Sequence, residues 1–398
     1  MGRLPVLFLL VLWGGTLEAE PEAFLARHWQ RPLAANGPAP GHFSPAESSL
    51  DPAACGSCHL RQFEDWRTSL HSRAMGPGLM GQLQAMGAGA REEHQACLHC
   101  HAPLAEQADH LVRTLTAKAT LPPGTEAVSA AQGLTCAGCH VRGQVRLGPP
   151  RADGSVPEPG RVLPHAGWQV EKAFADARFC AACHQFEPDW PSLNGKPLEN
   201  TNAEWQASRH AAEGRTCQSC HMPGRRHLWR GIHDPEMTRS ALTIDTPPSS
   251  TAGGRVRAEL SLANTGAGHA FPTYVTPRVQ VEIGQEDREG RPIGSSVERH
   301  LIARDVTLDL TAERADTRLM PGERRRYGYD RPLDPRAQGL VFRVIVQPDA
   351  FYADFYRATL ARSPSPLLQE ALRQAESSPY ELFSARQPLR RPGPWDGP

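Results

Sequence analysis

The chain has 398 residues, and 43 Lys and Arg residues balance 43 Asp and Glu residues, so the formal net charge is zero. This balance gives no support to binding of nucleic acid or of an anionic membrane surface. The 35 glycines and 37 prolines exceed their usual share of a globular chain. A chain so rich in turn-forming residues needs something besides long helices and sheets to hold it together, and its ten cysteines are the first place to look.

The first 19 residues have the pattern of a secretory signal peptide. Arg3 precedes an unbroken apolar run from Leu4 to Trp13, which is too short to span a bilayer as a helix. The segment Leu17-Glu18-Ala19 then fits a cleavage site, and residues 20–50 would form an N-terminal extension. We therefore expect export to the periplasm or beyond, with no transmembrane segment in the mature chain.

All ten cysteines belong to five copies of one motif, C-x-x-C-H, which is the attachment signal of c-type haem. Two thiols three positions apart can form thioether bonds to the vinyl groups of one porphyrin, and the adjacent histidine then reaches the iron from one face. The sequence therefore predicts five covalently bound haem c groups. The cysteine pairs, each with its proximal histidine, are Cys55, Cys58 and His59; Cys97, Cys100 and His101; Cys136, Cys139 and His140; Cys180, Cys183 and His184; and Cys217, Cys220 and His221.

Other uses of cysteine fit this pattern less well. Four-cysteine zinc sites and iron–sulfur clusters leave one of the five pairs over, and zinc needs no histidine after every pair. Disulfide bonds suit an exported chain, but a disulfide framework does not repeat one five-residue motif. Haem attachment is the interpretation that uses every cysteine.

The haem motifs begin 42, 39, 44 and 37 residues apart, which is too irregular for a strict solenoid repeat. The large apolar porphyrins would form much of the core at this density. For residues 51–240 we therefore expect a multihaem cytochrome c domain of short helices, loops and few strands. Its folding should depend on haem attachment, as small zinc domains depend on their metal.

The second axial ligand decides what each haem does, because a second histidine favours electron transfer and an open position permits substrate binding. Two of the twelve remaining histidines end a repeated phrase, acid-Trp-x-x-Ser-x-His, at residues 65–71 and 204–210, which predicts two similar short helices. The distal candidates from this phrase and from positions near the fourth and fifth motifs are His71, His210, His227, His233 and His165. We expect His99 to face solvent, and His28 and His300 to be structural.

Beyond Arg239 the chain has no cysteine, and apolar residues begin to alternate with polar ones, as in half-buried strands. Several such runs predict a small antiparallel β-sandwich over residues 241–348. The runs are Val256 to Leu262, Val279 to Ile283, Val306 to Leu310, and Phe342 to Val346.

Residues 349–398 are predicted to form C-terminal helices and a disordered tail. The aromatic residues from Phe351 to Tyr356 have helical spacing, and Leu367 to Ala375 is a second helix candidate. We interpret the aromatic stripe as core that docks this segment. Residues from Arg390 onward should be disordered.

The loop from Asn264 to Thr273 places a histidine, His269, between glycines and a proline. Glycines allow tight turns and a close approach to another surface. His269 could therefore be a distal ligand supplied from outside the haem-motif segment. The alternative is a rigid loop between strands with a hydrogen-bonded histidine.

Taken together, these features resemble the cytochrome c-554 family of multihaem cytochromes, over about residues 51–346. The shared elements are C-x-x-C-H followed by Trp-x-x-Ser-x-His, a second motif followed by Ala102-Pro103, the segment from Cys217 to Pro223, and the His269 loop with the segment from Asp316 to Glu323. The resemblance implies periplasmic electron transfer, mostly bis-histidine haems packed in pairs, and distal ligation by His71, His210 and His227. The chain departs from the family in having five motifs where the namesake has four haems, and Tyr274 where the loop usually continues with glycine.

We therefore predict a periplasmic pentahaem electron carrier that receives electrons from one redox protein and passes them to another. The alternative is an oxidoreductase in which one haem has an open position and acts on a small nitrogen or sulfur species. A third possibility is an oligomer or a subunit of a larger multihaem assembly, with the β-sandwich as its docking surface. The number of histidines suffices for five distal ligands, which favours the carrier and leaves the enzyme open.

Overall fold

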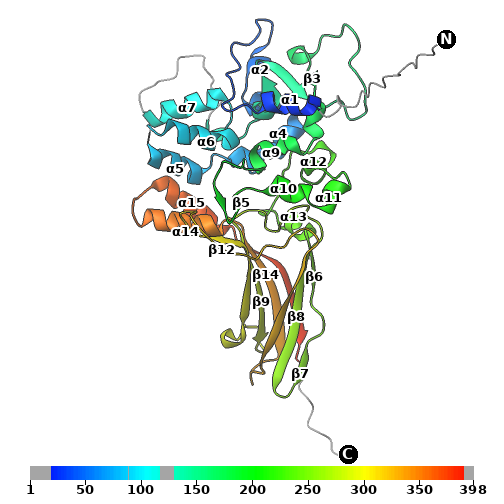
Figure 1. The fold of residues 1–398 in the computed structure, drawn as a ribbon, viewed down its shortest axis with the longest axis vertical. Coiled ribbons are helices and arrows are strands. Elements are labelled where there is room, and N and C mark those ends of the chain that lie inside the picture. The colour runs from blue at the N-terminus through cyan, green and yellow to red at the C-terminus, as the bar shows by residue number, and fades with distance from the viewer. Residues whose placement is uncertain (1–18, 88, 117–129, 390–398) are drawn as a thin grey trace, which may run out of the picture.

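The computed structural model describes residues 19–87, 89–116 and 130–389. Almost all of the expected signal peptide and the tail from Arg390 onward lie outside these ranges. None of the described helices is both long and apolar enough to cross a membrane. Figure 1 shows a helical half and a β-sheet half, with the C-terminal helices α14 (Ala350–Leu360) and α15 (Pro366–Ser377) beside the junction.

The helical half consists of short elements joined by loops. Its α-helices are α1 (Ala19–His28), α2 (Pro45–Ser48), α3 (Pro52–Gly56), α4 (Leu60–Arg67), α5 (Pro77–Met86), α6 (Arg91–His101), α7 (Ala105–Thr116), α8 (Cys136–His140), α9 (Arg178–His184), α10 (Thr201–Gln206), α11 (Arg209–Ala212), α12 (Cys217–His221) and α13 (Pro235–Ser240). The 3-10 helices are η1 (His71–Arg73), η2 (Ala130–Gln132), η3 (Pro164–Ala166), η4 (Lys172–Ala175) and η5 (Pro223–Arg225). Its strands are β1 (Val141–Arg142), β2 (Val145–Gly148), β3 (Gln169–Val170), β4 (Ser192–Leu193) and β5 (Lys196–Pro197).

Four of the five haem motifs share one local conformation, because α6, α8, α9 and α12 each end at the motif histidine. The helical turn places the two cysteines of a motif on the same side of the helix. In the first motif, α3 ends at Gly56 and His59 is the residue that precedes α4. The motifs therefore present their thiols and histidine from compact turns rather than from long helices.

The β-sheet half contains two antiparallel sheets. One has the order β10-β9-β14-β15, and the other has the order β13-β8-β6, with β7 also paired to β8. Their strands are β6 (Leu242–Asp245), β7 (Ser250–Ala252), β8 (Arg255–Asn264), β9 (Arg278–Glu286), β10 (Glu298–Ile302), β13 (Arg324–Pro332), β14 (Gly339–Gln347) and β15 (Tyr380–Pro388); η6 (Gly294–Ser296) precedes β10. A separate hairpin pairs β11 (Arg304–Val306) with β12 (Glu313–Asp316).

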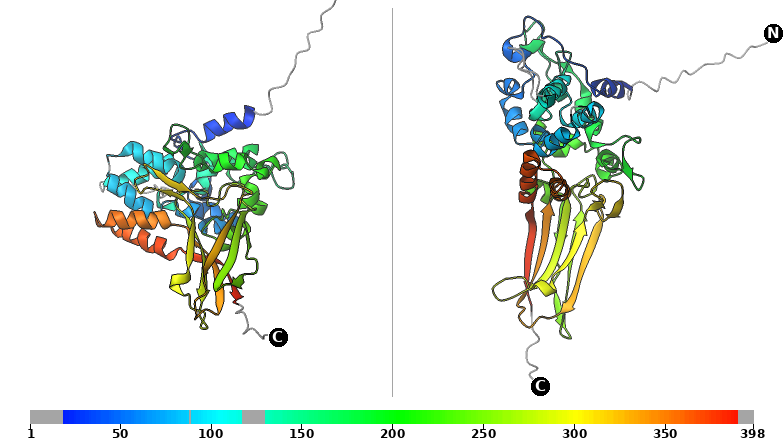
Figure 2. Two further views of the ribbon diagram at one scale, coloured as in Figure 1. Left: turned by 60° about the horizontal axis from the view of Figure 1, so that its bottom comes forward. Right: turned by 90° about the vertical axis from the view of Figure 1, so that its left-hand side faces the viewer.

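The two sheets enclose one apolar cluster. Val256, Leu260 and Leu262 of β8 face the same side, because every second residue of a strand points the same way. They are fully buried together with alternate residues of β9 and β14. Figure 2 shows the strands of this half in two layers. The alternating pattern in the sequence thus marks the faces that meet.

The strand predicted to run through Val306, Leu308 and Leu310 is wrong in its second half. β11 ends at Val306, and the chain then turns, with Thr307 Oγ1 accepting hydrogen bonds from the backbone amides of Thr311 and Ala312. Leu310 instead packs in a small cluster around Phe351. The alternation there reflects packing of a turn against α14 and not a longer strand.

Five strands of the two sheets, β6, β7, β10, β13 and β15, were not predicted from the sequence. β13 begins with three arginines, and its inward-facing residues are Tyr327 and Tyr329. β15 lies in the segment where we expected helices and a tail. It pairs with β14 along its whole length, from Gly339 opposite Pro388 to Val346 opposite Tyr380. The chain thus returns after α15 to complete the sheet.

The C-terminal helices pack on α5, which lies between the first and second haem motifs. A Cβ atom at Gly81 would lie 2.7 Å from Cδ2 of Leu368, so α15 can approach α5 this closely only over glycine. Gly78 is covered in the same way by the Tyr356 hydroxyl of α14. Segments separated by almost 300 residues are joined here, as Figure 1 shows.

Candidate haem-binding site

One connected cavity of about 2500 Å³ runs through the helical half. It is much larger than an ordinary ligand pocket of roughly 300–1,000 Å³. All ten cysteines and all five motif histidines line it, as do the six distal candidates. The residues predicted to attach and ligate haem are therefore gathered around one interior space, although they come from segments spread over more than 200 residues.

Four pairs of histidine rings face each other across this cavity. The ring centres of His59 and His165 lie 6.5 Å apart, those of His71 and His184 6.3 Å, those of His140 and His227 6.2 Å, and those of His221 and His269 6.3 Å. A metal–imidazole bond is about 2 Å long, so the ring centres of two imidazoles on opposite sides of one metal ion lie about 6 Å apart. Each pair therefore fits a haem iron between its rings.

Hydrogen bonds donated by Nδ1 orient most of these rings. Nδ1 of the distal candidates His165, His227 and His269 donates to a neighbouring backbone carbonyl at 2.8, 3.1 and 3.0 Å, respectively. Nδ1 of His140 and His221 donates to carbonyls at 2.8 and 2.7 Å. A histidine that donates from Nδ1 keeps the lone pair on Nε2, the atom that is then free to bind a metal.

Burial also keeps these imidazoles neutral. It lowers the pKa of His71 to about 3 and that of His140 and His269 to about 4. Neighbouring histidines lower these pKa values further. A metal ligand must be the neutral imidazole, so the surroundings favour the binding form at neutral pH.

Comparison with known proteins agrees with this geometry. The solved structure of a penta-heme cytochrome c552 from Thermochromatium tepidum has a similar fold, with a TM-score of 0.61 and 17% sequence identity over 87% of this chain and all of that one. Residues 54–141 match the model of the family described as cytochrome c554 and c-prime. The chain is a multihaem c-type cytochrome that resembles the cytochrome c-554 family. No curated protein matches this cytochrome.

Four of the six predicted distal candidates in this cytochrome face a proximal histidine, and two do not. Nδ1 of His210 lies 3.1 Å from a guanidinium nitrogen of Arg215, and no proximal ring faces His210 within the described residues. His233 bonds with Nε2 to the carboxylate of Asp349 at 3.0 Å. These contacts give the two side chains other partners, although both line the cavity.

His101, the proximal candidate of the second motif, has no histidine facing it at such a distance in the described part of the chain. Its Nδ1 donates to the carbonyl of Ala74 at 2.7 Å, as in the other motifs. Every histidine of the cytochrome lies within the described residues. The second motif therefore differs from the other four in the side chain available for the sixth position.

Polar groups gather near the second motif. Glu199, Tyr274 and Tyr352 line the cavity, and the Tyr274 hydroxyl lies close enough to Cys100, Glu199 and Tyr352 to interact with them electrostatically. Burial raises the pKa of Glu199 to about 7 and that of Tyr352 to about 12, and it also raises the pKa of Tyr274. These groups favour their protonated forms, so this part of the cavity can donate hydrogen bonds or protons.

Three contacts between thiols show which motifs are neighbours in space. The Cys55 thiol interacts directly with that of Cys136, Cys100 with Cys183, and Cys180 with Cys217. The first motif therefore lies beside the third, the second beside the fourth, and the fourth beside the fifth. The fourth motif touches two others, an arrangement that the order of motifs along the chain does not reveal.

Sequence reasoning missed the polar residues near the second motif, and it misplaced one other side chain. The expectation that His99 faces solvent is wrong, because the residue is 7% exposed and its Nε2 accepts a hydrogen bond from Nε of Arg31 at 2.8 Å. In the sequence, Tyr274 stands out only as a departure from the family pattern. Glu199 carries no signal in the sequence that distinguishes it from a surface glutamate.

Proposed function

We propose that this cytochrome is a periplasmic electron-transfer protein that carries five haem c groups, four of them with two histidine ligands. The observation that carries the proposal is the set of four facing histidine pairs with ring centres 6.2–6.5 Å apart. Haem c with two histidine ligands supplies one-electron redox chemistry without an open position for substrate.

The residues divide this work between attachment and ligation. The ten motif cysteines attach the groups, and the five motif histidines are the proximal ligands. The distal ligands are His165 for the first motif, His227 for the third, His71 for the fourth and His269 for the fifth. We assign His269 to the two-sheet unit, which we interpret as a small β-sandwich over residues 241–348.

The contacts between thiols support a route through the cytochrome. The first and third motifs form one neighbouring pair, and the second and fifth motifs both adjoin the fourth. Cys139 also lies close enough to Cys180 and Cys183 to interact with them electrostatically, so the third motif is near the fourth. The fourth motif is therefore the junction of the set. Electrons would enter from one redox protein and leave to another, after export by the N-terminal signal peptide.

The proposal is tested on the exported holoprotein. Intact-mass measurement should show five covalently attached haems, and the EPR spectrum of the oxidised protein should contain at least four low-spin haems. A haem count below five would contradict the assignment of attachment sites. Fewer than four low-spin haems would contradict the assignment of the histidine pairs.

A second candidate function is favoured by His101. Because no second histidine faces it among the described residues, the haem of the second motif is the one that would have an open position. The protonated groups of Glu199, Tyr274 and Tyr352 nearby are suited to the reduction of a small nitrogen or sulfur species, which consumes protons. In this case the other four haems would supply electrons to the second.

Spectroscopy separates the two functions. A high-spin EPR signal that shifts with nitrite, hydroxylamine or nitric oxide would support the enzyme. Five low-spin haems with no response to these ligands would exclude an open position and leave the pure carrier. The same additions to a Glu199→Gln variant should alter turnover but not the number of high-spin haems.

A further inference from the structure

The repeated phrases at residues 65–71 and 204–210, here the first and second phrases, are alike in their hydrogen bonds as well as in sequence. In the first phrase, Nε1 of Trp66 donates to the carbonyl of Leu134 at 2.7 Å. In the second, Nε1 of Trp205 donates to the carbonyl of Arg215 at 2.9 Å. Each acceptor lies two residues before the first cysteine of a haem motif, the third and the fifth, respectively.

The histidine that ends each phrase also forms an equivalent hydrogen bond in the two copies. The backbone amide of Leu134 donates to the carbonyl of His71 at 2.9 Å, and the amide of Arg215 donates to the carbonyl of His210 at 2.8 Å. In each copy, the residue two positions before the haem motif is therefore bonded to the phrase through both its carbonyl and its amide. The two segments are copies of one structural unit, which consists of a phrase and the haem motif that it supports.

The acidic residue of the first phrase bonds to a third segment. Asp65 Oδ2 accepts a hydrogen bond from the backbone amide of His227 at 3.0 Å. The guanidinium of Arg226 pairs with both carboxylate oxygens, at 2.6 and 2.5 Å. His227 is the histidine that faces His140 of the third motif.

The acidic residue of the second phrase, Glu204, likewise bonds to a segment far away in the sequence. Glu204 Oε2 accepts a hydrogen bond from the backbone amide of Ala270 at 3.0 Å and one from the Thr273 hydroxyl at 3.2 Å. Its Oε1 pairs with Arg318 at 2.9 Å. Ala270 directly follows His269, which faces His221 of the fifth motif.

In both copies the acid thus holds the segment that carries the histidine facing the supported motif. We propose that Asp65 and Glu204 are positioning residues that hold the distal ligands His227 and His269 over the third and fifth haem sites. This inference rests on the proposed ligation by these two histidines. It explains why an acid begins both phrases, although neither phrase supplies the ligand that its acid holds.

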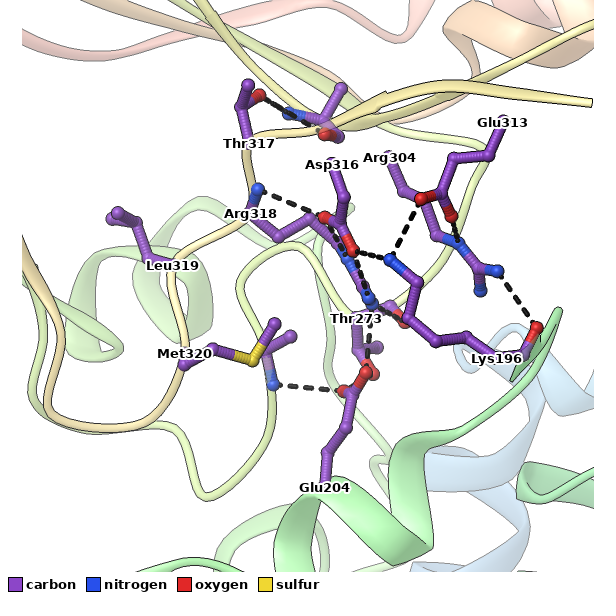
Figure 3. A network of polar contacts seen from close by, with 12 residues as sticks. Lys196, Glu204, Thr273, Arg304, Glu313, Asp316, Thr317, Arg318, Leu319 and Met320 are labelled. Carbon is purple, nitrogen blue, oxygen red and sulfur yellow. Dashed lines mark hydrogen bonds and ion pairs between the residues drawn. The ribbon is translucent and has the colours of Figure 1, made fainter. Parts of the chain in front are cut away.

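Burial and charge make these contacts specific. The side chain of Asp65 is 4% exposed and that of Glu204 is 7% exposed, so the partners of a removed carboxylate would be left unpaired in the interior. Figure 3 shows that Arg318 is held in turn by Asp316, at 2.9 Å, and that Asp316 pairs with Lys196 at 2.6 Å. A ligand displaced by about 1 Å from its metal is functionally lost, so this support bears directly on ligation.

Glycine brings the second ligand segment close to its acid. A Cβ atom at Gly268 would lie 2.9 Å from Cδ1 of Trp205, so the loop before His269 can pack on the second phrase only without a side chain. Asn264 Nδ2 also donates to the carbonyl of His269 at 2.8 Å. The position of His269 is therefore set by contacts on both sides of it.

The inference is tested with Glu204→Ala and Asp65→Ala variants of the exported holoprotein. Each should keep five attached haems and lose the low-spin EPR signal of one haem, and free imidazole should restore that signal by filling the vacated position. Glu213→Ala and Glu64→Ala are the matched controls, because they remove exposed carboxylates beside the same two phrases, and their spectra should equal that of the wild type.

The outcomes separate this inference from the proposed function. If His269→Ala loses a low-spin haem but Glu204→Ala matches its control, the positioning role of Glu204 is refuted and the ligation stands. If His269→Ala itself leaves all low-spin signals unchanged, the proposed ligation fails, and the inference at this site fails with it. Should Glu204→Ala not fold, Glu204→Gln keeps the volume and one acceptor, and a partial loss of the same signal is expected. A Glu204→Gln spectrum identical to that of Glu213→Ala would then overturn the inference.

Discussion

His71 and His210 occupy equivalent positions in the two phrases, but only His71 faces a proximal histidine. The carbonyl of each accepts a hydrogen bond from the residue two positions before a haem motif. That residue is buried Leu134 in the first copy and exposed Arg215 in the second, and Arg215 lies against the His210 ring. His71 instead meets His184 of the fourth motif across the cavity.

The difference shows that a phrase fixes the backbone position of its histidine but does not determine which side chain the imidazole ring faces. Ligation needs a second segment on the far side of the metal. In the first copy that segment is the fourth haem motif. In the second copy, the described chain places no proximal histidine opposite His210, and the histidine that faces the supported motif comes from the His269 loop. The resemblance to a family implied the same role for both histidines, and the three-dimensional arrangement separates them.

Replacement of single histidines gives the largest expected effect and tests whether the two phrases differ in this way. His71→Ala, His165→Ala, His227→Ala and His269→Ala should each convert one low-spin haem to high spin, because each leaves one sixth position open. His210→Ala should leave every low-spin signal in place. EPR of the oxidised proteins measures both results. Loss of a low-spin haem in His210→Ala would restore the equivalence of the two phrases.

The segments that lead into the two phrases also differ, and this gives a second prediction. The first phrase begins six residues after His59, whereas the second begins 20 residues after His184, and the longer connection carries Glu199. Burial raises the pKa of Glu199 to about 7 in the folded protein, above its ordinary value of about 4.5. The folded state therefore keeps its proton where the unfolded state loses it.

Stability should consequently fall as pH rises from about 4.5 to about 7, by up to roughly 3 kcal/mol from this group alone. In Glu199→Gln this part of the pH dependence should disappear, so the variant gains stability relative to the wild type at pH 8 and matches it near pH 4. Guanidinium unfolding followed by circular dichroism measures the difference. Parallel pH profiles for the two proteins would show that Glu199 ionises normally in the fold.

The smallest expected effect concerns the tryptophans that the two phrases share. Trp66→Phe and Trp205→Phe each remove one indole-to-carbonyl hydrogen bond and keep an aromatic ring. Each should cost about 1 kcal/mol of unfolding free energy, with the larger loss at Trp66, whose hydrogen bond is buried. Denaturant titration of both variants measures this. A much larger cost at Trp205 than at Trp66 would contradict the view that the two units are copies.

The local chemistry of the site could be predicted from the sequence because it is encoded in short motifs. Spacing within a haem motif places two thiols and a histidine on one turn, whatever surrounds that turn. The phrases likewise gave two short helical segments with a tryptophan and a histidine in fixed relation. Alternating apolar residues located β8, β9 and β14, because a strand with one buried face shows its period directly.

Other features could not be predicted, because they depend on partners far away in the chain. His165 meets His59 across more than 100 residues, and His227 meets His140 across almost 90. The run through Leu310 had a strand's alternation but packs as a turn against α14. The alternation in β15 changes phase between Leu382 and Phe383, and the segment becomes a strand because β14 offers an edge for it to pair with.

The five attachment motifs, and the histidine next to each pair of cysteines, can be identified from short stretches of sequence. Covalent attachment is read within five residues, so no tertiary information is needed. Only the folded chain shows which histidine faces which motif and that the second motif has none facing it among the described residues. It also shows that Asp65 and Glu204 bond to the segments of His227 and His269, which lie elsewhere in the chain. A haem iron joins side chains from both of its faces, and only the folded chain brings those faces together.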